Sequence, residues 1–371
     1  MTLSMEVTAT AGLARAGVIR TARGEIRTPC FMPVGTRGAV RHLSSADLTD
    51  LGVQIVLGNT YHLMLKPGAD VVEQLGGLHG FADWPGHVLT DSGGYQIFSL
   101  EPGGNVALDD EGVTFRSTYD GGTHRLTPES AVEIQTQLGA DMQMVLDVCA
   151  PLPSPTAVLR SAVERTALWA GRARSSFLRQ ERPDLSQLGI VQGGTDVPLR
   201  TESAQRTVTV GFDGYAMGGL SVGESRDAML ETLAATLPLL PADQPRYLMG
   251  LGDPLGMVDA VALGIDLFDC VLPTRFARHG TILSSEGRFN LKRAENITAD
   301  APLDERCGCP VCARWSRAYL RHLLVVDEPT APRLLTLHNV WWTLRLVEEL
   351  QTAVAGGTLA GVRSRIAAAY G

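Results

Sequence analysis

Two aspartates, Asp266 and Asp269, interrupt the apolar run GIDLFDCVLPTR at residues 264–275. A carboxylate in apolar surroundings loses hydration energy, so it usually has a partner or a chemical role. Because side chains alternate along a strand, the two aspartates are expected to face opposite sides. Asp269 lies nearer the C-terminal exit of the run and is the candidate for chemistry, whereas Asp266 is expected to make a structural hydrogen bond. The adjacent Cys270 is expected to face away and is given no role.

Polar residues also end other apolar runs, namely Asp91, Asp147, Gln192 and the pair Gly218-Gly219. Asp147 and Gln192 can accept and donate along the edge of a planar heterocycle, to which Gly219 can offer a backbone N–H. Tyr95 and Met249 can cover its two faces. The set outlines a nucleobase pocket with three carboxylates at its mouth, although a turn or helix-cap role is the alternative for any single aspartate.

Three cysteines and one histidine have the spacing of a zinc site. Cys307, Cys309 and Cys312 lie within CGCPVC, and His338 follows in LTLHNVWW. Three thiols need a fourth ligand for tetrahedral Zn²⁺, and His338 would complete a Cys3His set. Four protein ligands leave no position for water, so this zinc would be structural and would pin a small subdomain. A surface cysteine cluster beside a helical histidine with other partners is the alternative.

The elements that must position these residues follow a repeating order. Short apolar runs ending in polar or Gly-rich turns occupy residues 30–38, 53–62, 87–94, 142–151, 188–194, 214–220, 246–252 and 267–273. Most are separated by helix-like segments, two of which start with a cap and a proline, at Thr127-Pro128 and Ser154-Pro155. This order predicts an α/β protein built as a (β/α)8 TIM barrel, whose reacting groups sit at the C-terminal ends of the strands.

Two segments depart from this alternation. Residues 99–126 contain GVTFRSTYDGGTHRLT, whose DGG turn predicts an inserted β-hairpin after the third strand. Residues 278–338 follow the eighth strand and carry the cysteine cluster. We therefore expect a catalytic barrel formed by residues 1–277 and 339–371, with a zinc-binding subdomain at 278–338.

The composition limits the classes of partner. The chain of 371 residues has a net charge of −8, which argues against non-specific coating of nucleic acid. Residues 271–325, however, carry nine Arg or Lys against five acids, which indicates either a polyanionic partner or a solvated surface. Cys30, Cys149 and Cys270 are isolated, and no N-terminal apolar segment or membrane-spanning run is present, so we expect a reducing, cytoplasmic location.

Six ordered motifs resemble those of the bacterial tRNA-guanine transglycosylases, also called queuine tRNA-ribosyltransferases. They are GNTYHL (58–63), DSGGYQIFSL (91–100), GIVQGG (189–194), YLMGLG (247–252), FDCVLPTR (268–275) and the CGCPVC…H spacing. The resemblance implies that the wobble guanine (position 34) of GUN-anticodon tRNAs (Asp, Asn, His, Tyr) is exchanged for preQ1, 7-aminomethyl-7-deazaguanine, through a covalent enzyme–RNA intermediate in queuosine biosynthesis.

The resemblance also implies roles for particular residues. Asp269 would be the nucleophile, a role that suits an ionised carboxylate in a dry site, and Asp91 would be the proton acceptor. The base would be bound by Asp91, Ser92, Gly93, Gly94, Tyr95, Asp147, Cys149, Gln192, Gly218, Gly219, Leu220, Val222 and Met249. The tRNA would contact Gly250, Leu251, Gly252, Asp253, Pro254, Leu255, Gly256, Thr274, Arg275, Phe276, Ala277 and Arg278. One zinc per subunit and a homodimer patch at Trp315, Tyr319 and His322 complete the set; core packing is the alternative for that patch.

A few positions bear on substrate choice. Val222 and Cys149 fit the bacterial pattern that uses preQ1, whereas Val148 departs from it, because the family commonly has an acid there. This departure puts in doubt the hydrogen bonding behind the pocket and the discrimination between preQ1 and guanine. Two other functions are considered: a non-catalytic RNA-binding subunit of a transglycosylase heterodimer, and a zinc-dependent barrel hydrolase. Retention of both Asp91 and Asp269 disfavours the first, and the lack of a histidine cluster at the strand ends disfavours the second.

Overall fold

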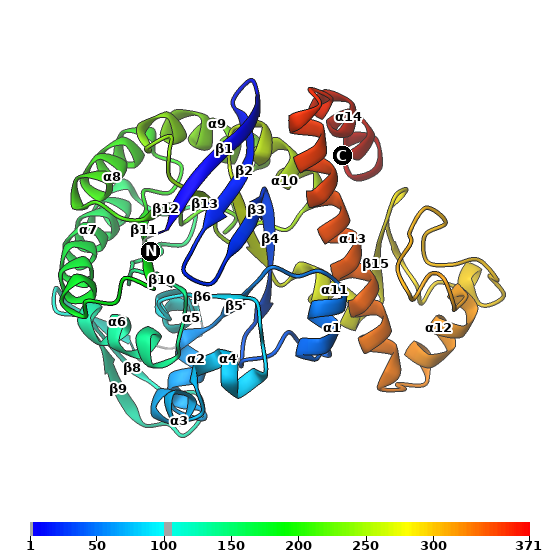
Figure 1. Ribbon diagram of the computed structural model, residues 1–371, viewed down its shortest axis with the longest axis horizontal. Helices are drawn as coiled ribbons and strands as arrows, with labels where there is room; N and C mark the ends of the chain where they lie inside the picture. Colours follow the sequence, from blue (N-terminus) through cyan, green and yellow to red (C-terminus); the bar gives the residue numbers. More distant parts are fainter. Residues whose placement is uncertain (1–2, 100–105) are drawn as a thin grey trace.

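The computed structural model describes residues 3–99 and 106–371, and its centre is a closed barrel of eight parallel strands (Figure 1). In chain order these are β4 (Cys30–Gly35), β5 (Ile55–Gly58), β6 (His87–Thr90), β10 (Met142–Met144), β11 (Ser186–Val191), β12 (Gly214–Met217), β13 (Arg246–Leu248) and β14 (Leu267–Cys270). Strand β14 pairs with β4 and closes the barrel. Each strand falls at or beside one of the eight predicted runs, so the predicted (β/α)8 barrel is confirmed.

Helices connect successive strands around the outside of the barrel. After β4, β5 and β6 come α1 (Ser45–Asp50), α2 (Thr60–Leu65), α3 (Ala69–Gln74), α4 (Gly77–Ala82), α5 (Gly94–Ser99) and α6 (Pro128–Gln137). The later strands are followed by α7 (Thr156–Arg179), α8 (Val197–Val210), α9 (Arg226–Thr236) with the short η1 (Leu237–Leu239), α10 (Pro254–Ala262) and α11 (Leu272–His279). No helix within the described ranges is long and apolar enough to cross a membrane.

The two predicted helix starts have different outcomes. Helix α6 begins as predicted, because the Thr127 hydroxyl accepts a hydrogen bond from the Ser130 amide and Pro128 is the first helical residue. The predicted cap at Ser154 is wrong. Pro155 keeps an extended backbone (φ −58°, ψ 145°), so it occupies the N-cap position itself and α7 begins at Thr156 without a side-chain cap.

A three-stranded antiparallel sheet precedes the barrel and was not predicted. It consists of β1 (Ser4–Ala11), β2 (Ala14–Arg20) and β3 (Glu25–Thr28). From β2, Arg15 reaches Asp266 and the backbone carbonyls of Ala242 and Gln244, which lie at the N-terminal ends of β13 and β14. The sheet therefore covers the end of the barrel opposite the predicted active site.

The insertion after the third barrel strand is larger than the predicted hairpin. Its described part forms a three-stranded antiparallel sheet of β7 (Val106–Leu108), β8 (Val113–Arg116) and β9 (Thr123–Leu126). The DGG turn does join β8 to β9, but β7 pairs with the other edge of β8; residues 100–105 lie outside the described residues.

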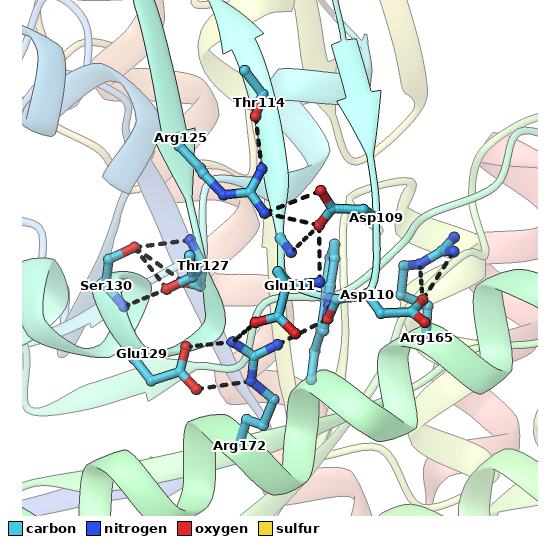
Figure 2. A network of polar contacts seen from close by, with 12 residues as sticks. Asp109, Asp110, Glu111, Thr114, Arg125, Thr127, Glu129, Ser130, Arg165 and Arg172 are labelled. Carbon is cyan, nitrogen blue, oxygen red and sulfur yellow. Dashed lines mark hydrogen bonds and ion pairs between the residues drawn. The ribbon is translucent and has the colours of Figure 1, made fainter.

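Ion pairs attach this sheet to the outer helices (Figure 2). The turn between β7 and β8 carries three acids, of which Asp110 pairs with Arg165 of α7 at 3.2 Å and Glu111 with Arg172 at 3.2 Å. Arg172 also pairs with Glu129 of α6 at 2.8 Å, so one guanidinium joins the insertion, α6 and α7. The insertion is therefore fixed to the barrel by charges as well as by its own apolar cluster.

An arm follows the eighth strand and stands beside the barrel (Figure 1). It comprises β15 (Thr281–Ser284), β16 (Gly287–Asn290), η2 (Ala294–Asn296) and α12 (Arg317–Val325), and the chain returns along α13 (Thr330–Ala355) and α14 (Leu359–Tyr370). Helix α13 packs on both α11 of the barrel and α12 of the arm. It runs without a break across residue 338, the predicted C-terminal limit of the subdomain, so that limit falls inside a helix.

Candidate active site and metal centre

A cavity of about 260 Å³ lies at the C-terminal ends of the barrel strands. The predicted site residues that line it are Asp91, Tyr95, Asp147, Cys149, Gln192, Gly218, Gly219, Leu220, Val222, Met249, Gly250 and Asp269. Ser92, Gly93 and Gly94 do not line it but form the turn below Asp91, in which Gly93 donates to the Asp91 carboxylate at 3.1 Å. The cavity thus brings together carboxylates from β14 and from the ends of β6 and β10.

Asp269 presents one carboxylate oxygen to fixed donors. Its Oδ1 accepts hydrogen bonds from the Tyr247 hydroxyl (2.5 Å) and from the Gly250 amide (2.7 Å). Within the described residues no donor bonds Oδ2. Burial raises the pKa of Asp269, and the bonds from Tyr247 and Gly250 oppose that rise.

Asp266 is the residue just before β14 and faces away from the side of Asp269, as expected. It is fully buried, accepts hydrogen bonds from the Arg15 guanidinium (2.8 Å) and from the Arg246 amide (2.7 Å), and does not line the cavity. The structural hydrogen bond predicted for it is confirmed. Cys270 corrects the expectation that it faces away, because it also lines the cavity. It is the last residue of β14, and Val271 already has helical angles (φ −80°, ψ −8°), so the strand alternation stops there.

Asp91 is held by four donors. They are the Thr60 amide (2.9 Å), the Gly93 amide (3.1 Å), the Gln96 side chain (2.7 Å) and the Asn59 side chain. Burial raises the pKa of Asp91 to about 6, even though these hydrogen bonds favour the charged form. A carboxyl group with this pKa can both give and take a proton near neutral pH.

Asp147 and Gln192 form a direct pair. The Gln192 amide nitrogen donates to Asp147 Oδ2 at 2.6 Å, and the backbone N–H of Gln192 donates to Ser203 at 2.9 Å, which fixes the strand end. Burial and the nearby Asp91 charge raise the pKa of Asp147 to about 6, against the bond from Gln192. Val148, where the family commonly has an acid, donates its backbone N–H to the Thr166 hydroxyl at 3.0 Å.

The rest of the cavity wall includes an exposed aromatic ring and a neutral thiol. The Tyr95 side chain is 52% exposed and so leaves a ring face accessible for stacking. Burial raises the pKa of the Cys149 thiol to about 12, so this group stays neutral at physiological pH and is a poor nucleophile.

Four polar lining residues escaped the sequence analysis: Asn59, Gln96, Ser221 and Tyr247. Asn59 follows β5 directly, so the strand-end argument used for Asp91 could have found it. Gln96 lies in α5, and only its place in the DSGGYQ segment pointed to it. Tyr247 lies inside β13 and is fully buried, which is the ordinary position of a core aromatic residue, so only its place at the start of the YLMGLG segment pointed to it.

The predicted RNA-binding segments lie beside the cavity mouth with unequal exposure. Gly250 lines the cavity, and Asp253 caps α10 by accepting a hydrogen bond from the Gly256 amide at 2.8 Å. The side chains of Leu255, Thr274 and Ala277 are buried and cannot contact RNA in this conformation.

Arginines beside these segments lack carboxylate partners. Burial lowers the pKa of Arg278, and the positive charges of Arg41 and Arg275 lower it further. Among the nine basic residues of 271–325, all within the described chain, only Arg293 forms an ion pair, with Glu295 at 4.0 Å. Arg317 and Arg321 instead donate hydrogen bonds to backbone carbonyls of the arm. The exposed cations without a carboxylate partner, which an external anion can reach, are Arg275, Arg288, Lys292, Arg306 and Arg314.

The four predicted metal ligands converge in the arm. Their ligand atoms all lie within 4.8 Å of one another, and His338 Nδ1 is 3.6, 3.4 and 3.3 Å from the sulfurs of Cys307, Cys309 and Cys312. The other ring nitrogen of His338 donates to the Leu283 carbonyl at 2.8 Å. This bond fixes the tautomer whose Nδ1 lone pair faces the sulfurs, as metal-binding histidines require. The residues therefore fit a tetrahedral metal ion such as Zn²⁺.

The predicted dimer patch is partly on the surface. Tyr319 and His322 of α12 are exposed, beside the exposed Val325 and Val326, which excludes core packing for those two rings. Trp315 is half-buried, and the Arg314 guanidinium lies 5.1 Å from its ring centre.

A closed (β/α)8 barrel with three carboxylates at one strand-end cavity is the arrangement of a barrel enzyme, with acidic side chains as the candidates for its chemistry. Within the described residues, the cluster in the arm is the only His/Cys/Asp/Glu group placed to hold a metal, so a zinc-dependent hydrolase at the cavity is not supported.

Comparison with known proteins identifies the family. The family model for queuine tRNA-ribosyltransferase matches residues 10–371. Similar proteins named queuine tRNA-ribosyltransferase occur in Solidesulfovibrio magneticus (49% identical, 97% of this chain and 95% of the relative) and Symbiobacterium thermophilum (48%; 95% and 87%). A third, from Geobacillus kaustophilus, is 46% identical over 96% of this chain and 93% of the relative. The chain belongs to the queuine tRNA-ribosyltransferase family.

This membership confirms the predicted activity, tRNA-guanine transglycosylation by a pentosyltransferase. It does not favour the alternative of a non-catalytic partner subunit.

Proposed function

We propose that this chain exchanges the guanine at wobble position 34 of GUN-anticodon tRNAs for preQ1 in queuosine biosynthesis. The observation that carries the proposal is the convergence of Asp91, Asp147 and Asp269 on one cavity at the strand ends. The bacterial relatives and the residues Val222 and Cys149 at the cavity support preQ1 as the incoming base.

Asp269 acts as the nucleophile. Its Oδ2, which no donor bonds among the described residues, attacks C1′ of the target ribose, while Tyr247 and Gly250 hold Oδ1. The bond from C1′ to N9 breaks, its electron pair leaves with guanine, and a covalent bond joins Asp269 to the RNA. The ribose-phosphate backbone stays intact throughout.

Asp91 handles the protons of both bases. In its protonated form it gives a proton to N9 of the departing guanine, which leaves a carboxylate. That carboxylate then takes the N9 proton from preQ1, whose nitrogen attacks C1′ and releases Asp269. The pKa of about 6 supports both directions near neutral pH, because neither form of Asp91 is rare there.

Asp147, Gln192 and Gly219 read the edge of the base, and Tyr95 stacks on its face. The Asp147–Gln192 pair at 2.6 Å supplies an acceptor and an amide beside each other. Asp91, Cys149, Gly218, Leu220, Val222 and Met249 enclose the base, and the turn of Ser92, Gly93 and Gly94 supports Asp91.

The tRNA lies across the segments 250–256 and 274–278. Arg275 and Arg278, which have no carboxylate partner among the described residues, hold backbone phosphates while the target base is flipped out. The exposed Arg288, Lys292, Arg306 and Arg314 of the arm extend this surface.

One zinc ion per subunit, held by Cys307, Cys309, Cys312 and His338, stabilises the arm at 278–338 as a separate subdomain. When bound, the metal supplies a structural cross-link and takes no part in the reaction. Cys309→Ser should lower both the zinc content and the thermal midpoint. A zinc-free protein with an unchanged midpoint would contradict a structural site.

Two copies of the chain form a cytoplasmic homodimer through Trp315, Tyr319 and His322. The exposure of Tyr319 and His322 on α12 supports this interface. Sedimentation velocity tests it: a monomer at micromolar concentration would contradict it.

The experiment for the function is an exchange assay with a GUN-anticodon tRNA and labelled guanine or preQ1. We expect label in the tRNA at position 34, with either guanine or preQ1 as the incoming base. The matched control is the same tRNA with adenine at position 34. Failure to incorporate label, with the zinc content and fold intact, would overturn the proposal.

A further inference from the structure

Arg200 is a fully buried cation behind the base cavity. It lies in the first turn of α8, does not line the cavity, and forms no ion pair within the described residues. Burial lowers the pKa of Arg200 to about 10, so the group remains charged at neutral pH. A buried charge without a counter-ion is costly, and a cation near the N-terminus of a helix adds a further cost. An apolar side chain could fill the same space without either cost.

The guanidinium is instead satisfied by three backbone carbonyls. It donates to Gly194 (2.7 Å), to Val191 (2.8 Å) and to Gly219 (3.3 Å). Val191 and Gly194 flank Gln192 at the end of β11, and Gly219 lies at the end of the neighbouring β12. One side chain therefore joins the two strand ends that carry base-reading groups.

These contacts require close packing of the backbone. A Cβ atom added at Gly193 would lie 2.9 Å from the backbone nitrogen of Arg200 at the start of α8, and one added at Gly219 would lie 2.3 Å from the Gln192 side-chain oxygen. Both glycines also have positive φ, 132° and 62°, where other residues are strained. The loop is thus shaped to let Arg200 and Gln192 approach it.

The bond to Gly219 fixes the direction of a peptide group. In a trans peptide the carbonyl and the following N–H point in opposite directions, so the Leu220 amide points away from Arg200. Leu220 lines the cavity, and its amide donates no hydrogen bond to any described residue. We propose that Arg200 is a positioning residue for base recognition, which holds Gln192 and the 219–220 peptide in place for the carbonyl edge of a guanine-like base.

This inference rests on the proposed function and makes a separate kinetic prediction. Loss of the three hydrogen bonds from Arg200 should weaken binding of the free base, since Gln192 and the 219–220 peptide lose their fixed direction. It should leave the Asp269 nucleophile and the tRNA surface unchanged, because Arg200 contacts neither.

The test compares Arg200→Lys and Arg200→Met with the control Arg174→Lys. Arg174 is 13% exposed and pairs with Asp213 at 2.9 Å at the opposite end of the barrel. We expect the KM for guanine to rise about tenfold in Arg200→Lys and further in Arg200→Met, with kcat and the KM for tRNA within about threefold. Arg174→Lys should lower the thermal midpoint without changing the KM for guanine.

Several results would overturn the inference. One is a wild-type KM for guanine in Arg200→Lys; another is a fall in kcat and tRNA affinity that matches the loss of stability. If Arg200→Met does not fold, Arg200→Lys decides alone, together with the amount of covalent RNA adduct formed without added base, which should equal that of wild type. An inactive wild-type enzyme would instead overturn the proposed function.

Discussion

Aspartates at the two ends of the barrel have different hydrogen-bonding and ion-pair partners. At the N-terminal ends, the residues just before β10, β12 and β14 are Asp141, Asp213 and Asp266, and each pairs with an arginine. The pairs are Arg23–Asp141 (2.8 Å), Arg174–Asp213 (2.9 Å) and Arg15–Asp266 (2.5 Å). Each aspartate also accepts a backbone N–H from a neighbouring strand, namely from Val88 (2.7 Å), Gln187 (2.9 Å) and Arg246 (2.7 Å). These carboxylates fasten strands together.

At the C-terminal ends, the carboxylates meet only neutral donors. Among the described residues, Asp91, Asp147 and Asp269 have no cation within ion-pair distance, and their partners are amides and one tyrosine hydroxyl. Burial raises the pKa of all three. A charge that is not neutralised by a fixed cation remains able to react or to exchange a proton, and here it costs stability. The type of partner therefore separates the structural carboxylates from the candidates for chemistry.

The largest expected effect is at Asp269. Asp269→Asn keeps the hydrogen-bonding oxygen but removes the proposed nucleophile, so no covalent RNA adduct should form and base exchange should fall by at least about 1,000-fold. Adduct formation on a denaturing gel, with tRNA and no added base, is the measurement. Asp266→Asn, three positions earlier in the chain, is the control and should still give a detectable adduct. Equal loss of adduct in both variants would contradict a chemical role for Asp269 alone and a structural role for Asp266.

The next effect concerns stability at Asp266. Asp266→Asn leaves the Arg15 guanidinium buried without its counter-charge, so the free energy of unfolding should fall by about 3–5 kcal/mol. Urea unfolding measures this loss, and Asp269→Asn should not show it. The double variant Arg15→Met with Asp266→Asn should recover part of the loss, because no unpaired charge remains. Unchanged stability in Asp266→Asn would show that the ion pair does not fasten the strands.

The sequence predicted the catalytic end of the barrel well, because strand ends follow from local patterns. Each apolar run stops at a polar residue, and parallel strands in a closed barrel bring those ends together. Asp91, Asp147, Gln192 and Asp269 could therefore be placed at one cavity. The opposite end could not be predicted in this way. The partner of Asp266 is Arg15, 251 positions away in a sheet that the alternating pattern did not reveal.

Two other features of the structure were also not predicted from the sequence. Tyr247 has the pattern of a core residue, and only its distance to Asp269 gives its hydroxyl a role. Strand β7 is three residues long, too short for a periodic signal, so the insertion was predicted as a hairpin. The CGCPVC spacing, by contrast, marks the metal cluster from local sequence, since three of its four ligands lie within six residues.

The smallest expected effect is a difference in pH dependence between the two ends. The folded-state pKa of Asp147 is raised to about 6, so its ionised form costs stability above that pH and costs nothing below about pH 4, where it is protonated in both states. Asp147→Asn should therefore raise the free energy of unfolding at pH 7 by about 1–3 kcal/mol and have little effect at pH 4.

Asp141→Asn should show the opposite sign. Burial alone would raise the pKa of Asp141, but hydrogen bonds from His79 and Arg23 lower it, so its ionised form adds stability above about pH 4 that is lost as the pH falls further. This variant should be less stable than wild type at pH 7 and approach it under acidic conditions. Urea midpoints at pH 4, 5.5 and 7 give both curves. If the two variants change stability in the same direction at pH 7, the charge of the partner does not decide how these aspartates act.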